Sequence, residues 1–331
     1  MSTLQTCTSG SRPSHGAGVI AYETDTTRTI ISDGSNWHLY MPDLFTRATC
    51  AFSLRQIVPD YTGHCVKVRR SSDDGEVDIG FTDTGVLDQA ALLTHTGTGG
   101  SDTGQVVTWY DQGPDSMNAT NTTAAQQPTI VSAGAVVVSN SKPSLAFDAA
   151  GAGSADMLLC PDYVARRKET MMWQMANPTP NAGLAVCELT DVTDTSDKVL
   201  FGTTYTSLFD TLGDSLGASD NSGMKFKRVS APNSPAGVQL WDTAALVNTT
   251  QAIAWFNFNG TTTGISTNGG SEQTTTDTPN PYSLVMQTVG SGQYASQGWE
   301  GKISELVLYT LDRSAQKAAI LANVNGFYGT Y

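Results

Sequence analysis

A loop rich in carboxylates is the first part of this sequence that could do chemistry. Asp73, Asp74 and Glu76 lie within four residues of one another, and two serines separate them from a pair of arginines. Clustered carboxylate oxygens are the ligands that Ca2+ prefers, so the loop is a candidate calcium site. The alternative, which we favour, is a structural network of ion pairs among Arg69, Arg70, Asp73 and Asp78. We therefore predict no cofactor, with calcium as the alternative.

Two groups of aromatic residues beside polar ones are candidates for sugar binding, because an aromatic face stacks on the C–H surface of a sugar. The first group is continuous: Trp109, Tyr110, Asp111 and Gln112. Trp and Tyr on a strand are more often core residues, with Asp111 capping the turn that follows, so we interpret this group as structural. The second group lies beside predicted turns and forms the predicted glycan site: Trp241, Asp242, Tyr294 and Trp299. For each of these four residues the alternative is a buried anchor beneath a loop.

The cysteines and histidines lack the spacing of a metal site. The five cysteines are Cys7, Cys50, Cys65, Cys160 and Cys187, with no Cys-x-x-Cys pair, and the four histidines are far apart. A zinc site needs ligands in close pairs. We therefore predict buried, reduced thiols.

The composition predicts an acidic protein built from strands. Of the 331 residues, 15% are charged and 39% are hydrophobic, and Thr and Gly are abundant, which favours strands and turns over long helices. The formal net charge of −13 repels phosphate backbones, so we expect no nucleic-acid partner. No apolar run is long enough to span a membrane and no signal peptide is visible, so we expect a soluble protein made in a cytoplasm.

An N-terminal segment over residues 1–45 differs in pattern from the rest of the chain. Residues 1–16 predict a leader that is flexible or ordered by a partner, and residues 18–43 predict a three-stranded meander around an Asp-Gly turn. A meander of this size buries little apolar surface and is only marginally stable on its own. We therefore predict that residues 1–45 are an attachment and oligomerisation segment.

Residues 46–331 predict a single, mainly β domain. A helix is expected over residues 51–58 and a short one after Asp88, and many short strands separated by turn signals follow. The chain closes with a helix from Ser314 to about Asn325. Short strands with regular turn signals are typical of a β-sandwich or jelly roll.

A series of short sequence blocks between residues 51 and 148 is more specific than the overall composition. In order they are AFSLRQI, DYTGHCVKVRRSSDDGEVDIGF, GVLDQAALL, VVTWYDQG, NAT, QQPTIV and KPSLAFD. They resemble the jelly-roll domain of the α-L-arabinofuranosidase B family, and they resemble still more closely bacteriophage virion proteins with the same concanavalin-like domain. The last segment, GWEGKISELVLYTLDRSAQKAAILANVNGFYG, is similar to the closing strand and helix of laminin-G and concanavalin-like domains. The resemblance implies a concanavalin A-like, laminin-G-like sandwich over residues 46–331.

The resemblance to a glycosidase raises the question of catalysis, because retaining glycosidases use two carboxyl groups about 5–5.5 Å apart. The arabinofuranosidase family has its acid/base in a Gly-Gly-Asp-Asn segment and its nucleophile in an Asp-Met-Glu segment. Residues 287–293, which match the first segment, contain no acid, and the second segment does not occur, nor does the family's Cys-Cys pair. The carboxylates that remain are Glu188, Glu300 and Glu305. We therefore predict no catalytic residue and no enzymatic activity.

The N-terminal meander, GVIAYETDTTRTIISDGSNWHLY, is similar to a short element near the N-termini of phage tail and appendage proteins. Together with the jelly roll it implies a virion surface appendage, of tail-fibre, spike or head-fibre type, with a lectin-like domain that adheres to host glycans. The expected partners are other virion proteins through residues 1–45, a host surface polysaccharide, and further copies of the chain in a homotrimer. The expected location is the virion, assembled in the host cytoplasm. Two alternatives stay open: a structural head-decoration, tail or collar component without a ligand, and a glycoside hydrolase of arabinofuranosidase type.

Overall fold

The structure is a computed structural model that describes most of the chain, with gaps. The described residues are 5–14, 20–24, 28–32, 37–39, 44–46, 48–148, 155–160, 181–190, 198–202, 215–218, 224–228, 238–241, 249–259, 262–276, 288–291, 298–309 and 311–331. The continuous stretch over residues 48–148 contains most of the sequence blocks named above.

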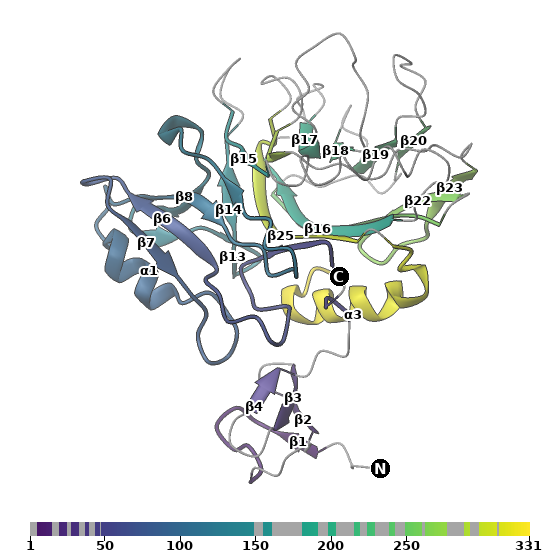
Figure 1. Cartoon of the computed structure of the whole chain (residues 1–331), viewed down its shortest axis with the longest axis horizontal. Coiled ribbons are helices and arrows are strands. Elements are labelled where there is room, and N and C mark those ends of the chain that lie inside the picture. The colour runs from purple at the N-terminus through teal and green to yellow at the C-terminus, as the bar shows by residue number, and fades with distance from the viewer. Residues whose placement is uncertain are drawn as a thin grey trace.

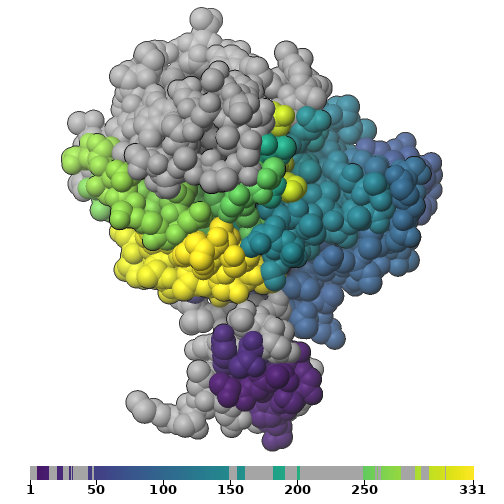
Figure 2. All heavy atoms as spheres, turned by 180° about the vertical axis from the view of Figure 1, so that it is seen from behind, coloured from purple at the N-terminus to yellow at the C-terminus, as the bar shows by residue number. Residues whose placement is uncertain are grey.

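A small sheet and a large one make up most of the described part of the molecule (Figure 1). The small sheet forms a separate lobe below the main body, as the view from behind in Figure 2 also shows. Its four strands are β1 Gln5–Cys7, β2 Ile20–Glu23, β3 Arg28–Ser32 and β4 Trp37–Leu39. The large sheet joins nineteen antiparallel strands, which confirms the predicted mainly β sandwich.

The strands of the large sheet are mostly short. Its first part comprises β5 Cys50–Ser53, β6 Val66–Arg70, β7 Glu76–Ile79, β8 Gly104–Trp109, β9 Ala119–Thr120, β10 Thr129–Ser132, β11 Ala135–Val136 and β14 Leu145–Phe147. Its second part comprises β15 Leu158–Leu159, β16 Asn181–Leu189, β17 Lys198–Gly202, β18 Ser215–Ala218, β19 Met224–Arg228, β20 Val238–Trp241, β21 Gln251–Phe258, β22 Thr262–Thr267, β23 Gln273–Thr276, β24 Thr288–Val289 and β25 Gly301–Tyr309. Strands β12 Val138–Ser139 and β13 Lys142–Pro143 form a separate ribbon.

The described helices are few. They are α1 Gln89–Thr96 and α3 Lys317–Tyr328, with the 3-10 turns η1 Ala124–Gln126 and η3 Ser314–Gln316. Asp88 caps α1 as predicted, since its Oδ1 accepts a hydrogen bond from Ala91 N at 2.9 Å. Helix α3 confirms the predicted C-terminal helix and ends at Gly329, whose positive φ suits glycine.

The helix predicted over residues 51–58 is wrong. Residues 50–53 form β5 instead, which is buried at every position and pairs with β25. The apolar spacing that suggested a helix arises because this strand is covered on both faces. Pairing with a partner distant in sequence overrides the local pattern.

Two apolar cores lie on opposite faces of β25, which occupies the middle of the large sheet. Leu306 and Leu308 point into the larger core, together with Trp109 and other large side chains. Val307 and Tyr309 point the other way, into a second core covered by α3 (Figure 1). Successive residues of a strand alternate between its faces, so a strand buried on both sides is apolar almost throughout.

The N-terminal segment differs from its prediction in two ways. Residues 5–7, expected in a leader that is flexible or ordered by a partner, form β1, which pairs in parallel with β2 of the same chain. Leu44 and Phe45 belong to the core beneath α3. Tyr309 OH and Arg313 Nη2 donate hydrogen bonds to Leu44 O at 2.8 and 2.7 Å. The main body therefore begins before the boundary expected at residue 45, and the attachment role of residues 1–45 stays a prediction.

None of the five cysteines, all of which lie among the described residues, forms a disulfide, in agreement with the predicted thiols. Cys50, Cys65, Cys160 and Cys187 are buried, and Cys7 is half-buried. Burial raises the pKa of the Cys187 thiol to about 12, which keeps it protonated and unreactive at neutral pH. Among the described residues, no helix has both the length and the apolar character needed to cross a membrane.

Phe45→Ala should lower the free energy of unfolding by about 3 kcal/mol or more, because it opens a cavity beneath α3. The measurement is urea unfolding followed by tryptophan fluorescence. Val77→Ala, at a side chain that is 44% exposed, is the control and should change stability by less than about 0.5 kcal/mol. Equal stability of both variants would contradict the assignment of Phe45 to this core.

Candidate functional site

A row of side chains across neighbouring strands forms one wall of a pocket of about 410 Å3. Arg69 on β6 lies opposite Gln105 on β8, Gln105 opposite Thr129 on β10, and Thr129 opposite Ala146 on β14. Residues paired across strands point to the same face, and Asp148, two positions beyond Ala146, continues that face. The register of the sheet therefore brings Asp148 and Arg69 to one pocket.

The opposite wall comes from two loops that are tied together. It contains Ala124 and Ala125 of η1, Gln127, and Asp156, which precedes β15. Met157 N donates to Gln126 O at 2.9 Å, and Asn121 Nδ2 donates to Met157 O at 2.8 Å. These bonds hold the segment that carries Asp156 against the loop before β10.

Arg69 is the cation of the pocket, and its neighbours fix its position. Its Nε donates to Gln127 Oε1 at 2.8 Å, and its Nη1 donates to Asp74 Oδ1 at 2.6 Å. Gln127 is itself held, because its Nε2 donates to Asn121 O at 2.8 Å. A guanidinium oriented in this way can recognise oxygen atoms of a ligand.

Two residues with carboxyl groups, Asp148 and Asp156, line the pocket and are joined by hydrogen bonds through their backbones. Asp156 N donates to Asp148 O at 2.9 Å, and Asp148 N donates to Asp156 Oδ2 at 3.0 Å. Burial raises the pKa of Asp156 to about 7, and the neighbouring Asp148 carboxylate adds to this rise. Asp156 is therefore protonated on a large share of molecules at neutral pH, while Asp148 is exposed at the pocket.

A carboxyl group with a raised pKa and a second, exposed carboxyl group in one pocket are an arrangement suited to acid-assisted hydrolysis. Protonated Asp156 can donate a proton to a leaving oxygen, and a carboxylate at Asp148 can stabilise positive charge. Sequence analysis missed both residues. Asp148 ends the block KPSLAFD, but Asp156, eight positions later, stands in no motif.

The acidic loop contains ion pairs, largely as predicted. Arg70 Nε and Nη2 donate to Asp73 Oδ1 and Oδ2, both at 2.6 Å, and Arg69 pairs with Asp74. The hydrogen bond from Arg70 lowers the pKa of Asp73 to about 2. No group of three or more His, Cys, Asp or Glu side chains in the described part of the chain could hold a metal ion.

The residues from Trp109 to Gln112 are structural, as interpreted. Trp109 is fully buried, and Tyr110 OH donates to Asp78 Oδ1 at 2.6 Å, so Asp78 pairs with a tyrosine rather than an arginine. Gln112 Oε1 accepts from Ile57 N at 2.8 Å. Asp111 caps its turn by accepting hydrogen bonds, at 2.7, 2.8 and 2.8 Å, from the backbone N–H groups of Ala51, Gly113 and Met117.

The predicted glycan site is not brought together within the described residues. Trp299 is fully buried, and its Nε1 donates to Glu188 O at 3.2 Å. A ring without an exposed face cannot stack on a sugar, so the structure corrects the prediction for Trp299 and supports the alternative of a buried anchor. Asp242, Tyr294 and the side chain of Trp241 lie outside the described residues.

The three glutamates left by the motif search do not line the pocket. Glu305 is fully buried, and Arg55 Nε and Nη2 donate to its two oxygens at 2.8 and 3.0 Å. Glu188 is almost fully buried and pairs with Lys302 Nζ at 2.7 Å. Glu300 is half-buried just before β25. The first two serve the structure, because their charges are neutralised inside the fold.

Comparison with known proteins supports a glycosidase-like fold. No protein-family model and no curated protein matches the sequence. Among solved structures, an arabinofuranosidase complexed with arabinofuranosyl-α-1,2-xylobiose is similar, with a TM-score of 0.59 and 15% identity over 86% of this chain. A GH54 α-L-arabinofuranosidase soaked with a cyclic sulfate inhibitor is similar as well, with a TM-score of 0.58 and 15% identity over 86% of this chain. The likeness is one of fold, and the chain covers 63% of each of these enzymes.

This finding corrects two predictions. The virion-appendage interpretation and the prediction of no enzymatic activity are wrong as leading interpretations, because the similar structures are arabinofuranosidases and nothing supports a virion role. The glycoside hydrolase alternative is better supported. The two catalytic motifs of the arabinofuranosidase family are missing from the sequence, but carboxyl groups from other segments can meet in the folded chain. A homotrimer and a polysaccharide partner stay predictions.

Asp156→Asn should stabilise the protein at high pH. A carboxyl whose pKa rises from 3.8 to about 7 on folding favours the folded state at low pH, and that contribution is lost as the pH rises through about 7. Asparagine carries no charge and keeps an acceptor for Asp148 N. At pH 8 to 9 the variant should therefore be more stable by about 1 kcal/mol, allowing for solvent screening.

The measurement is the free energy of unfolding between pH 4 and pH 9. Asp60→Asn is the matched control, since Asp60 is exposed and lies outside the pocket. A difference between Asp156→Asn and wild type that does not change with pH would contradict the raised pKa.

Proposed function

We propose that the chain is a glycoside hydrolase of arabinofuranosidase type, with Asp148 and Asp156 as its pair of carboxyl groups. One observation carries the proposal: two residues with carboxyl groups line the same pocket, and one of them has a pKa near neutrality. The fold that holds this pocket is similar to that of arabinofuranosidases. Perturbed carboxyl groups gather at functional sites, which supports assigning the chemistry here.

Asp156 is suited to be the general acid. In the proposed reaction its proton passes to the oxygen of the glycosidic bond as the bond from that oxygen to the anomeric carbon breaks. The sugar then carries positive charge at the anomeric carbon, and the Asp148 carboxylate stabilises it. Water adds to that carbon and its proton returns to Asp156, so the enzyme is regenerated.

The remaining lining residues are suited to hold a sugar. Arg69 is fixed by two hydrogen bonds, and Gln105, Gln127 and Thr129 offer neutral donors and acceptors for hydroxyl groups. A volume of about 410 Å3 lies within the range of small-ligand pockets. The similar enzyme complexed with arabinofuranosyl-α-1,2-xylobiose supports an arabinofuranosyl group as the substrate.

The protein should hydrolyse 4-nitrophenyl α-L-arabinofuranoside, and Asp156→Asn should lower kcat by about 10²–10⁴-fold through loss of the acid. Because the acid must be protonated, kcat/KM should fall as the pH rises through about 7. The measurement is release of nitrophenol between pH 4 and pH 9.

Asp60→Asn is the control here too and should keep wild-type activity. Rates no higher than the uncatalysed reaction, or full activity in both Asp156→Asn and Asp148→Asn, would contradict the proposal. An activity that survives in both variants would mean that the reaction takes place elsewhere on the chain.

A further inference from the structure

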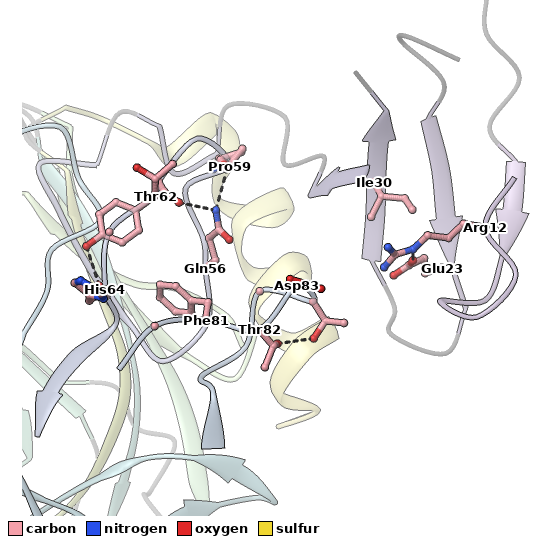
Figure 3. A pocket seen from close by; sticks show the side chains of 15 residues that line it. Arg12, Glu23, Ile30, Gln56, Pro59, Thr62, His64, Phe81, Thr82 and Asp83 are labelled. Carbon is pink, nitrogen blue, oxygen red and sulfur yellow. Dashed lines mark hydrogen bonds and ion pairs between the residues drawn. The ribbon is translucent and has the colours of Figure 1, made fainter. Parts of the chain in front are cut away.

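A second pocket, of about 400 Å3, lies between the N-terminal sheet and the main body (Figure 3). We call it the interlobe cleft. Its lining residues are Arg12, Glu23, Ile30, Gln56, Pro59, Tyr61, Thr62, Gly63, His64, Gly80, Phe81, Thr82, Asp83, Thr84 and Gly85. None of these residues lines the pocket of Asp148 and Asp156.

The main body contributes an aromatic wall to the interlobe cleft. The rings of Tyr61 and Phe81 meet edge to face, with centroids 6.3 Å apart, and both are half-buried. Tyr61 OH donates to His64 O at 2.8 Å, which fixes its ring. Gln56 Nε2 donates to Pro59 O at 3.0 Å and to Tyr61 O at 3.0 Å, so the loop that carries Tyr61 is held from behind.

The N-terminal sheet contributes a cation. Figure 3 shows Arg12 pointing from that sheet toward the cleft, and its Nε donates to the nearly buried Glu23 Oε1 at 2.5 Å. No partner for the Nη atoms of Arg12 lies among the described residues. Asp83, exposed on the main body, is the carboxylate on the opposite side.

The chemistry of the cleft fits a neutral, hydroxyl-rich ligand. Beyond the Arg12–Glu23 ion pair, its polar groups are an exposed carboxylate, an amide, an imidazole and the hydroxyls of three threonines, beside two aromatic rings. Hydroxyl groups of a sugar can donate to a carboxylate and accept from a guanidinium, and C–H faces pack on aromatic rings. We propose that the interlobe cleft is a second carbohydrate site that binds a neutral oligosaccharide without hydrolysing it.

The position of the cleft suits an accessory role. The cleft reaches His64, just before β6, and the pocket of the carboxyl pair reaches Arg69, near the end of that strand. A strand advances about 3.3 Å per residue, so the two pockets lie about 17 Å apart. A chain of several sugar units is long enough to reach both. The choice of ligand class rests on the proposed function.

Gly80 offers a clean way to block the cleft. It lines the cleft, and a Cβ built on it meets no atom within 4 Å, so a side chain can start there without a clash with its neighbours. Gly100 has equally open surroundings but lies outside both pockets. Gly80→Leu and Gly100→Leu are therefore matched variants, one blocking the cleft and one not.

The experiment is calorimetric titration with arabinofuranosyl-α-1,2-xylobiose, in full-length Asp156→Asn so that the ligand is not cleaved. We expect two molecules bound per chain, one after addition of Gly80→Leu, and two after addition of Gly100→Leu. Asp83→Ala should weaken the same site about tenfold. Hydrolysis of 4-nitrophenyl α-L-arabinofuranoside by otherwise wild-type Gly80→Leu should be unchanged.

The outcomes separate this inference from the proposed function. If the carboxyl pocket binds no sugar, one molecule binds per chain and Gly80→Leu abolishes that binding, which still supports the cleft. Binding that Gly80→Leu leaves unchanged in number and affinity would overturn the cleft assignment, as would the absence of any binding. Thermal unfolding of Gly80→Leu at the wild-type temperature shows that a loss of binding is not a loss of fold.

Discussion

The whole molecule depends on the pairing of one strand, β25. It holds β14 and β5 on one edge and β16 along the other, and its two faces belong to two different cores. These partners come from regions far apart in the sequence, so the sheet is continuous only when the C-terminal segment has taken its place. The entropy of closing such long loops is offset only when the apolar faces of β25 are covered on both sides. The position of Asp148 in its pocket also depends on β25, because Asp148 directly follows β14, which pairs with β25.

Among the described residues, the most buried carboxylate, Glu305, has a structural role. Glu305 lies on the same face of β25 as Val307 and Tyr309 and therefore faces α3, and a bulge opposite Val186 and Cys187 turns Ile303 to the other face. There Arg55 forms two hydrogen bonds to Glu305, and Arg55 Nη1 donates to Asn323 Oδ1 at 3.0 Å. A buried ion pair of this kind adds little net stability, but it specifies how strand and helix fit together. A glutamate held in this way has no freedom to act on a substrate.

Local features of the fold could be predicted from the sequence, and long-range ones could not. Asp88 before an apolar stretch indicates a helix start, and Asp111 before a glycine indicates a capped turn; both depend on bonds within a few residues. The strand β5 escaped prediction because its apolar spacing is set by β25, some 250 positions away. Asp148 and Asp156 lie only eight positions apart, but the pocket that they share with Arg69 depends on the register of four strands. The absence of the family's two catalytic motifs was therefore weak evidence against enzymatic activity, because catalysis depends on which chemical groups meet in space.

The two pockets differ in a way that follows from what each must do. A general acid near neutral pH requires a carboxyl group partly removed from water, and the same burial limits the surface left for recognising a long ligand. The pocket of Asp148 and Asp156 meets the first requirement, since burial is the main cause of the raised pKa of Asp156. The interlobe cleft meets the second, with aromatic rings and hydroxyls on one side and Arg12 on the other. Because Arg12 lies in the N-terminal lobe and lines the interlobe cleft, the proposed binding of a sugar in this cleft gives that lobe a function.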